Sequence, residues 1–210
     1  MPRGLRRYHD TGHSHFVTFS CYQRRPNFNR NEIYDLFPEC LERMRCRFEM
    51  SIYGYVVMPE HVHLLLSEPE RGSLAEAIHY LKLSFSKRVK TVAQVTSPRL
   101  GQPMAEPGAQ LRTWTTKHNR NVEHRDPFWQ KQYHDRNVRD GREFTIKLRY
   151  LHRNPVKRGL VKEAAQWKWS SFRHYFFREV GVVEIESEWT ARDREVKALG
   201  LAPRIFLCPR

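Results

Sequence analysis

Two histidines stand two residues apart within the apolar run 55–66 of this chain. Successive side chains of a β-strand alternate between faces, so His61 and His63 would project to one side and Val62 and Leu64 to the other. Two adjacent imidazoles could hold one Mn, Zn or other divalent ion, and a third ligand from elsewhere would leave positions open for a substrate. An isolated pair of this spacing more often fills a half-polar sheet face. Here the pair follows a Pro-Glu turn, where a chain re-enters a sheet.

A tyrosine and an asparagine lie one helical turn apart further along the chain. Phe144, Leu148 and Leu151 recur at i, i+4 and i+7, which predicts a helix with one buried face. A different face of that helix would carry the polar residues Glu143, Lys147, Tyr150 and Asn154. A phenol on a wet, basic helix face can attack a phosphodiester and form a covalent phosphotyrosine.

Each of these two residues also has an ordinary alternative. Tyr150 could be an interface residue with a buried ring and a wet hydroxyl. Asn154 could complete the metal site, or could stabilise a helix end, because Pro155 restricts the residue before it and predicts that the helix stops at 154.

The charge of the chain is strongly positive and unevenly distributed. Lys and Arg number 37 against 23 Asp and Glu, which gives a net charge of +14. Residues 1–30 carry +5 and residues 112–158 carry +8, whereas residues 31–111 carry −1 and residues 159–210 carry +2. A merely solvated surface mixes both signs. Two basic blocks around a near-neutral scaffold favour a groove that follows nucleic-acid phosphates.

Length and composition are those of one globular domain with appendages. The chain has 210 residues, of which 40% are hydrophobic and 12% aromatic, which is enough for a substantial core. No apolar run reaches membrane-spanning length and the first residues lack a signal-peptide segment, so we expect a cytoplasmic protein with no membrane partner. The four cysteines form no C-x-x-C pair, so neither a zinc ribbon nor a disulfide framework is indicated.

Hydrophobic periodicity predicts the elements that would position these residues. Strands are expected over 15–22, 51–57, 61–67 and 128–138, and a first helix over 31–47 with Pro38 inside it. Ser73 and Glu76 have the spacing of a capping box at the start of a second helix. The buried stripe of that second helix would consist of Leu74, Ile78, Leu81 and Phe85.

The order of these elements is β-α-β-β-α-β, followed by the helix that carries Tyr150. It predicts an α+β protein with a ferredoxin-like core and an antiparallel sheet. Residues 91–126 are rich in Pro, Gly and polar residues without periodicity, which predicts a flexible insertion. Alternating polar and apolar residues over 183–188 predict a short extra strand.

Four segments together resemble a known family. Residues 57–65, 128–130, 150–161 and 169–171, which read VMPEHVHLL, FWQ, YLHRNPVKRGLV and WSS, resemble the REP-associated tyrosine transposases. This bacterial group lies within the single-tyrosine HUH transposase superfamily. The resemblance covers about residues 8–175 and implies one HUH nuclease domain over 1–175 with a C-terminal extension over 176–210.

The resemblance implies a metal-dependent endonuclease and strand transferase that acts on single-stranded, palindromic repetitive extragenic DNA. His61 and His63 would be ligands of a divalent Mg or Mn ion, and Tyr150 would be the nucleophile that forms a 5′-phosphotyrosine. Asn154 matches a position where autonomously mobile relatives commonly carry Gln, and it would assist the metal. The partner would be single-stranded or hairpin DNA, and the protein a monomer or homodimer. The basic residues expected to contact DNA are Arg3, Arg6, Arg7, Arg24, Arg25, Lys82, Lys131, Arg136, Lys147, Lys157 and Arg158.

Two other classes of function fit parts of the same sequence. The first is a catalytically silent nucleic-acid-binding protein, in which Trp129 and Tyr133 stack on bases. The second is a metal-dependent phosphohydrolase that uses only His61 and His63. Cleavage of a single-stranded hairpin with and without Mg or Mn separates all three classes.

The basic N-terminal arm leads to a prediction about recognition. We expect Arg3, Arg6 and Arg7 to read bases at the foot of a hairpin, so replacing them costs about 1–3 kcal/mol of binding free energy on the cognate site and little on scrambled DNA. Binding to matched and scrambled hairpins at several salt concentrations measures this. Equal losses on both, with a smaller salt slope, would instead mean phosphate contacts.

Overall fold

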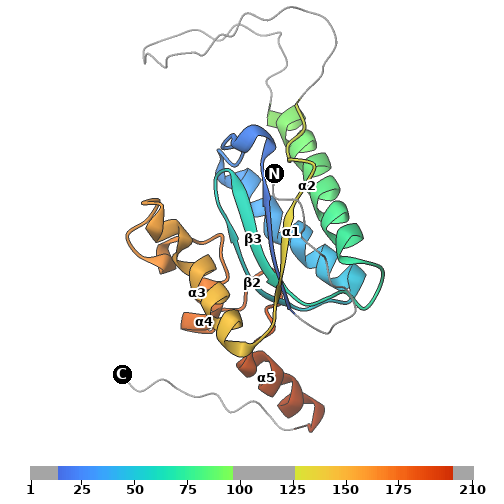
Figure 1. The fold of residues 1–210 in the computed structure, drawn as a ribbon, viewed down its shortest axis with the longest axis vertical. Helices are drawn as coiled ribbons and strands as arrows, with labels where there is room; N and C mark the ends of the chain where they lie inside the picture. The colour runs from blue at the N-terminus through green and yellow to red at the C-terminus, as the bar shows by residue number, and fades with distance from the viewer. Residues whose placement is uncertain (1–13, 97–125, 201–210) are drawn as a thin grey trace, which may run out of the picture.

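The computed structural model describes residues 14–96 and 126–200, and Figure 1 shows the arrangement of their elements. The predicted arginines 3, 6 and 7, and most of the predicted insertion, lie outside these residues. The strands are β1 (Ser14–Ser20), β2 (Ile52–Val57), β3 (His61–Leu66) and β4 (His134–Val138). They form one sheet in the order β2-β3-β1-β4, and every neighbouring pair is antiparallel. The predicted α+β class and ferredoxin-like order are confirmed.

The fourth strand is shorter than its sequence pattern predicts. Only His134–Val138 pairs along β1, whereas Trp129 forms a single bridge with Cys21. The Trp129 side chain is 5% exposed and packs edge-on against Phe19, with a ring-centroid distance of 4.9 Å. A ring buried in the core cannot stack on a base, so the alternative role for Trp129 is wrong.

Two helices cover one face of the sheet. These are α1 (Asn31–Phe48), which keeps Pro38 inside it, and α2 (Leu74–Thr96). The predicted capping box is present, because Ser73 N–H donates to Glu76 Oε2 at 2.8 Å and Glu76 N–H donates to Ser73 Oγ at 3.3 Å. The helix continues past 91, where an insertion was expected, since residues 91–96 contain neither Pro nor Gly. Within the described residues, no helix is long and apolar enough to cross a membrane.

Helix α3 (Gly141–Lys157) covers the opposite face of the sheet (Figure 1). It begins where Asp140 Oδ1 accepts from Glu143 N–H at 2.7 Å. The expected end at Asn154 is wrong, because the helix runs on through Pro155 to Lys157. A proline in the last turn removes only one backbone N–H donor. The helical hydrogen bond from the Arg158 N–H to the Asn154 carbonyl still forms, at 3.0 Å.

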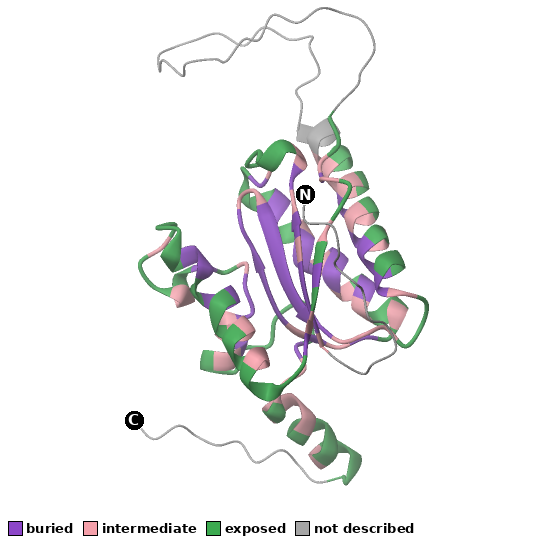
Figure 2. Ribbon diagram, viewed as in Figure 1, coloured by how far each residue is buried: buried purple, intermediate pink, exposed green. Residues whose placement is uncertain are grey.

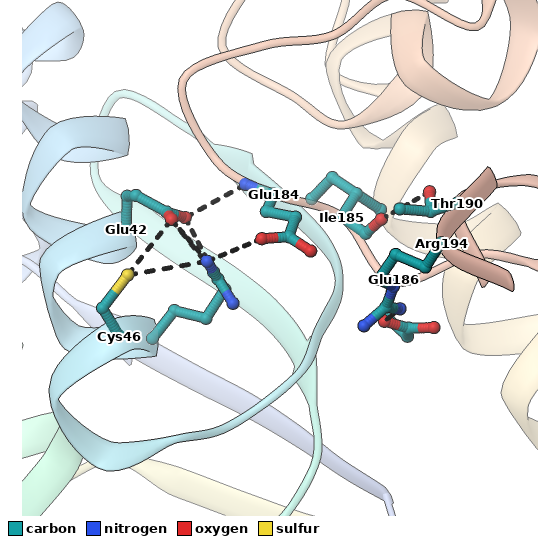
Figure 3. Close-up of polar contacts among 8 residues, drawn as sticks. Glu42, Cys46, Glu184, Ile185, Glu186, Thr190 and Arg194 are labelled. Atoms are coloured by element: carbon teal, nitrogen blue, oxygen red, sulfur yellow. Dashed lines mark hydrogen bonds and ion pairs between the residues drawn. The ribbon is translucent and has the colours of Figure 1, made fainter. Parts of the chain in front are cut away.

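The chain after α3 returns to the core before it ends. It forms two short helical turns, η2 (Ala164–Gln166) and α4 (Phe172–Phe177), and then α5 (Glu188–Ala198); a further turn, η1 (Tyr22–Arg24), follows β1. Val183 and Ile185 are buried, yet only Ile185 pairs with the sheet, through one parallel bridge to Ile52. The extra strand is therefore reduced to a single bridge. Figure 3 shows how Glu42 of α1 accepts from the Glu184 N–H at 3.0 Å, which ties this segment to α1.

Buried residues concentrate in the sheet and on the helix faces turned toward it (Figure 2). The core is strongly aromatic between the sheet and α1 and α2. Phe28 lies at its centre, with ring centroids 5.1 Å from Tyr34, 5.3 Å from Phe85 and 5.4 Å from Phe128. Cys21 and Cys40 are buried free thiols and Cys46 is an exposed one.

A buried histidine in β1 makes the stability of the protein depend on pH. His15 is fully buried; its Nδ1 lies 2.8 Å from Asp135 Oδ1 and its Nε2 lies 3.2 Å from Glu68 Oε1. Burial opposes the charge, but the two carboxylates outweigh it and raise the pKa of His15 above its usual value. A raised folded-state pKa means that this ion pairing stabilises the protein fully below about pH 6.5 and is lost as the pH rises through the folded value.

We therefore expect the free energy of unfolding to fall as the pH rises from about 6.5, with His15 as the cause. Urea unfolding at closely spaced pH values measures it. In His15→Gln this part of the pH dependence should disappear. An equal slope in the variant and the parent would show that another group is responsible.

Candidate active site

The two histidines face the same side of β3, as the strand periodicity predicts. In the register with β1, His61 lies opposite Ser20 and His63 opposite Thr18. Thr18 Oγ1 lies 2.7 Å from His63 Nδ1, and this contact orients the His63 ring so that its Nε2 faces His61. The two Nε2 atoms are 3.0 Å apart. The pair therefore presents two nitrogens at one point on the sheet.

Burial keeps both imidazoles uncharged near neutral pH. His61 and His63 are each 6% exposed. Burial, together with the charges of the neighbouring His61 and Lys147, lowers the pKa of His63 to about 3. Burial also lowers the pKa of His61, partly opposed by Glu60, whose Oε1 lies 3.2 Å from His61 Nδ1. Neutral imidazole is the form that binds metal ions.

The geometry of the pair fits one divalent ion. Two nitrogens that each lie about 2.0–2.1 Å from one ion, at angles near 90–110°, are themselves about 3 Å apart. The observed separation of 3.0 Å agrees with this. Among the residues described, no group of three or more His, Cys, Asp or Glu side chains could hold a metal.

Tyr150 of α3 lies directly against the histidine pair. Its ring centroid is 5.4 Å from that of His63 and 6.0 Å from that of Phe16, both in edge-on contact. The side chain is 44% exposed, so the ring is held while the phenol remains accessible. Lys147, one turn earlier, places its ammonium 4.9 Å from the centre of the Phe16 ring. Burial and the charge of Arg136 lower the pKa of Lys147.

Asn154 is buried, contrary to the wet helix face expected from the sequence. It is 6% exposed and lies one turn after Tyr150. One turn further, Arg158 donates to Glu60 Oε1 at 2.6 Å, beside His61. Tyr150, Asn154 and Arg158 follow one another at single-turn spacing and so share one side of the helix, with Tyr150 beside His63 and Arg158 beside Glu60.

Contacts between distant segments hold α3 in this position. Gly54 of β2 leaves room for the helix, since a Cβ there would lie 2.8 Å from Leu148 Cδ1. The buried His152 Nε2 lies 2.8 Å from Ser171 Oγ, which accepts from Tyr55 N–H at 3.0 Å. Sequence reasoning missed His152 and Ser171 as positioning residues. The signal was present, because both lie within the segments 150–161 and 169–171 quoted above.

The predicted DNA-contacting residues divide between the two faces. Lys147 and Arg158 lie beside the histidine pair. Arg24 is also near, because its charge contributes to the lowered pKa of His61, although less than burial does. Lys157 is exposed on the same helix. Lys82 lies on the other face, where its ammonium donates to the Gln130 carbonyl at 2.6 Å.

Within the described part of the chain, the remaining cations of this set are exposed. Arg25 pairs with Asp126 at 2.7 Å, and Arg136 pairs with Glu143 at 2.9 Å. Lys131 is exposed, and its carbonyl accepts from Lys82 Nζ at 3.1 Å. Exposed pairs of this kind contribute little to stability, so their cations can exchange partners with phosphates at small cost.

Known proteins share the sequence pattern and the fold. Residues 9–101 match the family described as Transposase IS200 like. A Haemophilus influenzae protein provisionally named a REP-associated tyrosine transposase is 30% identical over 118 residues, or 55% of each chain, so the match spans about half the length of that relative. The REP-associated tyrosine transposase of Escherichia coli K12 is 22% identical over 167 residues, which cover 80% of this chain and 81% of the relative.

A solved structure described as a REP-associated tyrosine transposase bound to a REP hairpin has the same fold. It superposes with a TM-score of 0.60 at 17% identity, and the match covers 89% of this chain and 93% of that one. The sequence comparisons agree with one another: residues 9–101 are similar to the IS200-like transposases, and longer stretches of the chain are similar to REP-associated tyrosine transposases, whose solved structure has the same fold.

Proposed function

We propose that this protein nicks and rejoins single-stranded DNA beside a REP-type hairpin, with Tyr150 as the nucleophile. The observation that carries the proposal is the contact of the Tyr150 ring with His63, whose Nε2 lies 3.0 Å from that of His61. The half-exposed phenol of Tyr150 therefore places a nucleophile beside two neutral imidazoles that could bind a divalent ion. The relative described as bound to a REP hairpin supports this class of substrate.

The proposed step is an in-line exchange at one phosphorus. The Tyr150 oxygen loses its proton and bonds to phosphorus, while the bond from phosphorus to the 3′-oxygen breaks. The departing oxygen takes up a proton and becomes a free 3′-hydroxyl, and the 5′-phosphate stays on Tyr150. Rejoining is the reverse, with a 3′-hydroxyl displacing the tyrosine. Lys147, with its lowered pKa, is a candidate acceptor for the phenol proton.

His61 and His63 would hold a Mg or Mn ion, with Asn154 as a candidate third ligand. When bound, the ion supplies polarisation of the scissile phosphate and neutralisation of its charge. The chain itself contributes orientation. Thr18 orients His63, the edge-on contacts with His63 and Phe16 position Tyr150, and the bond from His152 to Ser171 holds α3 against the sheet. Arg24, Lys147 and Arg158 surround the site with positive charge, which attracts the phosphate backbone.

A labelled hairpin with a single-stranded flank tests the proposal, incubated with and without Mg or Mn. We expect a metal-dependent covalent adduct that survives denaturing electrophoresis, together with a free 3′-hydroxyl on the released fragment. Binding without cleavage would favour a silent binding protein. Cleavage without an adduct would favour a phosphohydrolase that uses the histidine pair alone. The cytoplasmic location, the physiological metal, the oligomeric state and the domain boundary at 175 stay predictions.

A further inference from the structure

A pocket lies against α1 and α2, on the opposite face of the sheet from Tyr150. It is an open pocket of about 400 Å³ between the η1 turn, the start of α1 and the second half of α2. We call it the α1–α2 pocket. Its lining combines aromatic rings, amides and cations: Tyr22, Arg25, Asn27, Asn29, Arg30, Ile33, Ser86, Val89, Lys90, Asp126, Pro127 and Phe128.

Ring packing and hydrogen bonds hold the walls of this pocket together. Phe128 packs against Phe85 and Phe28, with ring centroids 5.0 Å and 5.4 Å apart, so it belongs to the aromatic core. The Tyr22 N–H donates to the Phe128 carbonyl at 2.9 Å, and Asn27 Nδ2 donates to the same carbonyl at 3.0 Å. These bonds hold the η1 turn against the 126–128 segment. The pocket is thus built by contacts across more than a hundred residues of sequence.

The chemistry of the lining suits a nucleotide. A ring such as Tyr22 or Phe128 can stack on any base, because every base has a π-face. Arg30 and the exposed Lys90 provide positive charge at the same pocket. Arg30 is also the N-cap of α1, and an arginine side chain has no acceptor for the first-turn N–H groups. The helix start adds a preference for anions to the two cations.

The pocket is joined to the active site through the turn that precedes His61. The Cys21 N–H donates to the Glu60 carbonyl at 2.8 Å, and the Phe28 N–H donates to the Pro59 carbonyl at 3.1 Å. The segment that lines the pocket therefore packs on the turn that leads into the histidine pair. A DNA strand that leaves the site at this edge of the sheet can pass over the turn and reach the pocket.

We propose that the α1–α2 pocket binds one unpaired nucleotide of the single-stranded segment next to the hairpin, a proposal that rests on the proposed function for its substrate. The base stacks on Tyr22 and Phe128, and the phosphate lies between Arg30, Lys90 and the start of α1. A volume of about 400 Å³ is within the usual range for small-ligand sites, and it fits one nucleotide rather than a duplex. The pocket would thereby hold the strand after it has passed over the turn between the two faces of the sheet.

Binding measurements on two matched DNAs test this inference without DNA cleavage. All proteins carry Tyr150→Phe, and the DNAs are one hairpin with and without a single-stranded flank of about six nucleotides, within the range bound by small single-strand-binding folds. We expect Tyr22→Leu with Lys90→Ala to weaken binding of the flanked hairpin by about tenfold and to leave the blunt hairpin nearly unchanged. Lys87→Ala is the control, because Lys87 is exposed on the same helix but does not line the pocket.

Cross-linking locates the nucleotide. We place 5-iododeoxyuridine at each flank position in turn and expect one position to cross-link to the peptide that contains Tyr22 or to the one that contains Phe128. Equal weakening on both DNAs, equal effects in Lys87→Ala, or cross-links confined to α3 would each overturn the proposal. These binding and cross-linking assays need no cleavage. Failure of adduct formation with intact Tyr150 would therefore reject the proposed function without changing what the assays say about the pocket.

Discussion

Tyr150→Phe is expected to abolish covalent protein–DNA adducts, lowering their rate by roughly 10³-fold or more, while hairpin affinity changes by less than about twofold. The hydroxyl is the proposed nucleophile, whereas the ring makes the contacts with His63 and Phe16 that phenylalanine retains. The measurement is the adduct yield over time on a labelled hairpin with Mg or Mn, with affinity determined in parallel.

Tyr80→Phe is the matched control for this experiment. Tyr80 lies on α2, across the sheet from the histidine pair, and packs against Phe48 with a ring-centroid distance of 5.8 Å. The same loss of a phenol oxygen there should leave adduct formation unchanged. If Tyr150→Phe still forms an adduct at the parental rate, another residue is the nucleophile. If both variants lose activity, the effect is not specific to the site.

Replacing either histidine by alanine is expected to lower metal-dependent cleavage by roughly 10²-fold or more, because one nitrogen cannot hold the ion that both were positioned to bind. Both side chains also contribute packing, since His61 and His63 are each only 6% exposed. We therefore expect each variant also to lose about 1–3 kcal/mol of folding free energy.

A direct metal-binding measurement separates the two effects. Mn²⁺ titration by calorimetry on the folded protein should show one site in the parent and none in His61→Ala or His63→Ala, below the unfolding temperature of each variant. His79→Ala is the control, because His79 is an exposed histidine on α2. Unchanged Mn²⁺ binding in both site variants would refute the two-histidine site, whatever happens to cleavage.

Local periodicity was sufficient to predict most of the scaffold. The alternation of a strand is a property of the backbone, so it placed His61 and His63 on one face without knowledge of the neighbouring strands. The spacing of apolar residues predicted the helices that became α1, α2 and α3, and the capping box marked the start of α2. The order of these elements then left few topologies, and the ferredoxin-like one is observed.

Other features depend on contacts between segments far apart in the chain, which no local period encodes. The chain has nine tyrosines, and the packing of α3 against β3 is what puts Tyr150 beside His63. That packing needs the space at Gly54 and the bond from His152 to Ser171.

Tertiary packing also decided the burial of Asn154, the burial of the Trp129 ring and the existence of the α1–α2 pocket. The sequence by itself determined which side chains could do chemistry and on which elements they lie. Only the tertiary structure decided which of them meet, because a side chain's neighbours are set by the packing of whole helices on the sheet.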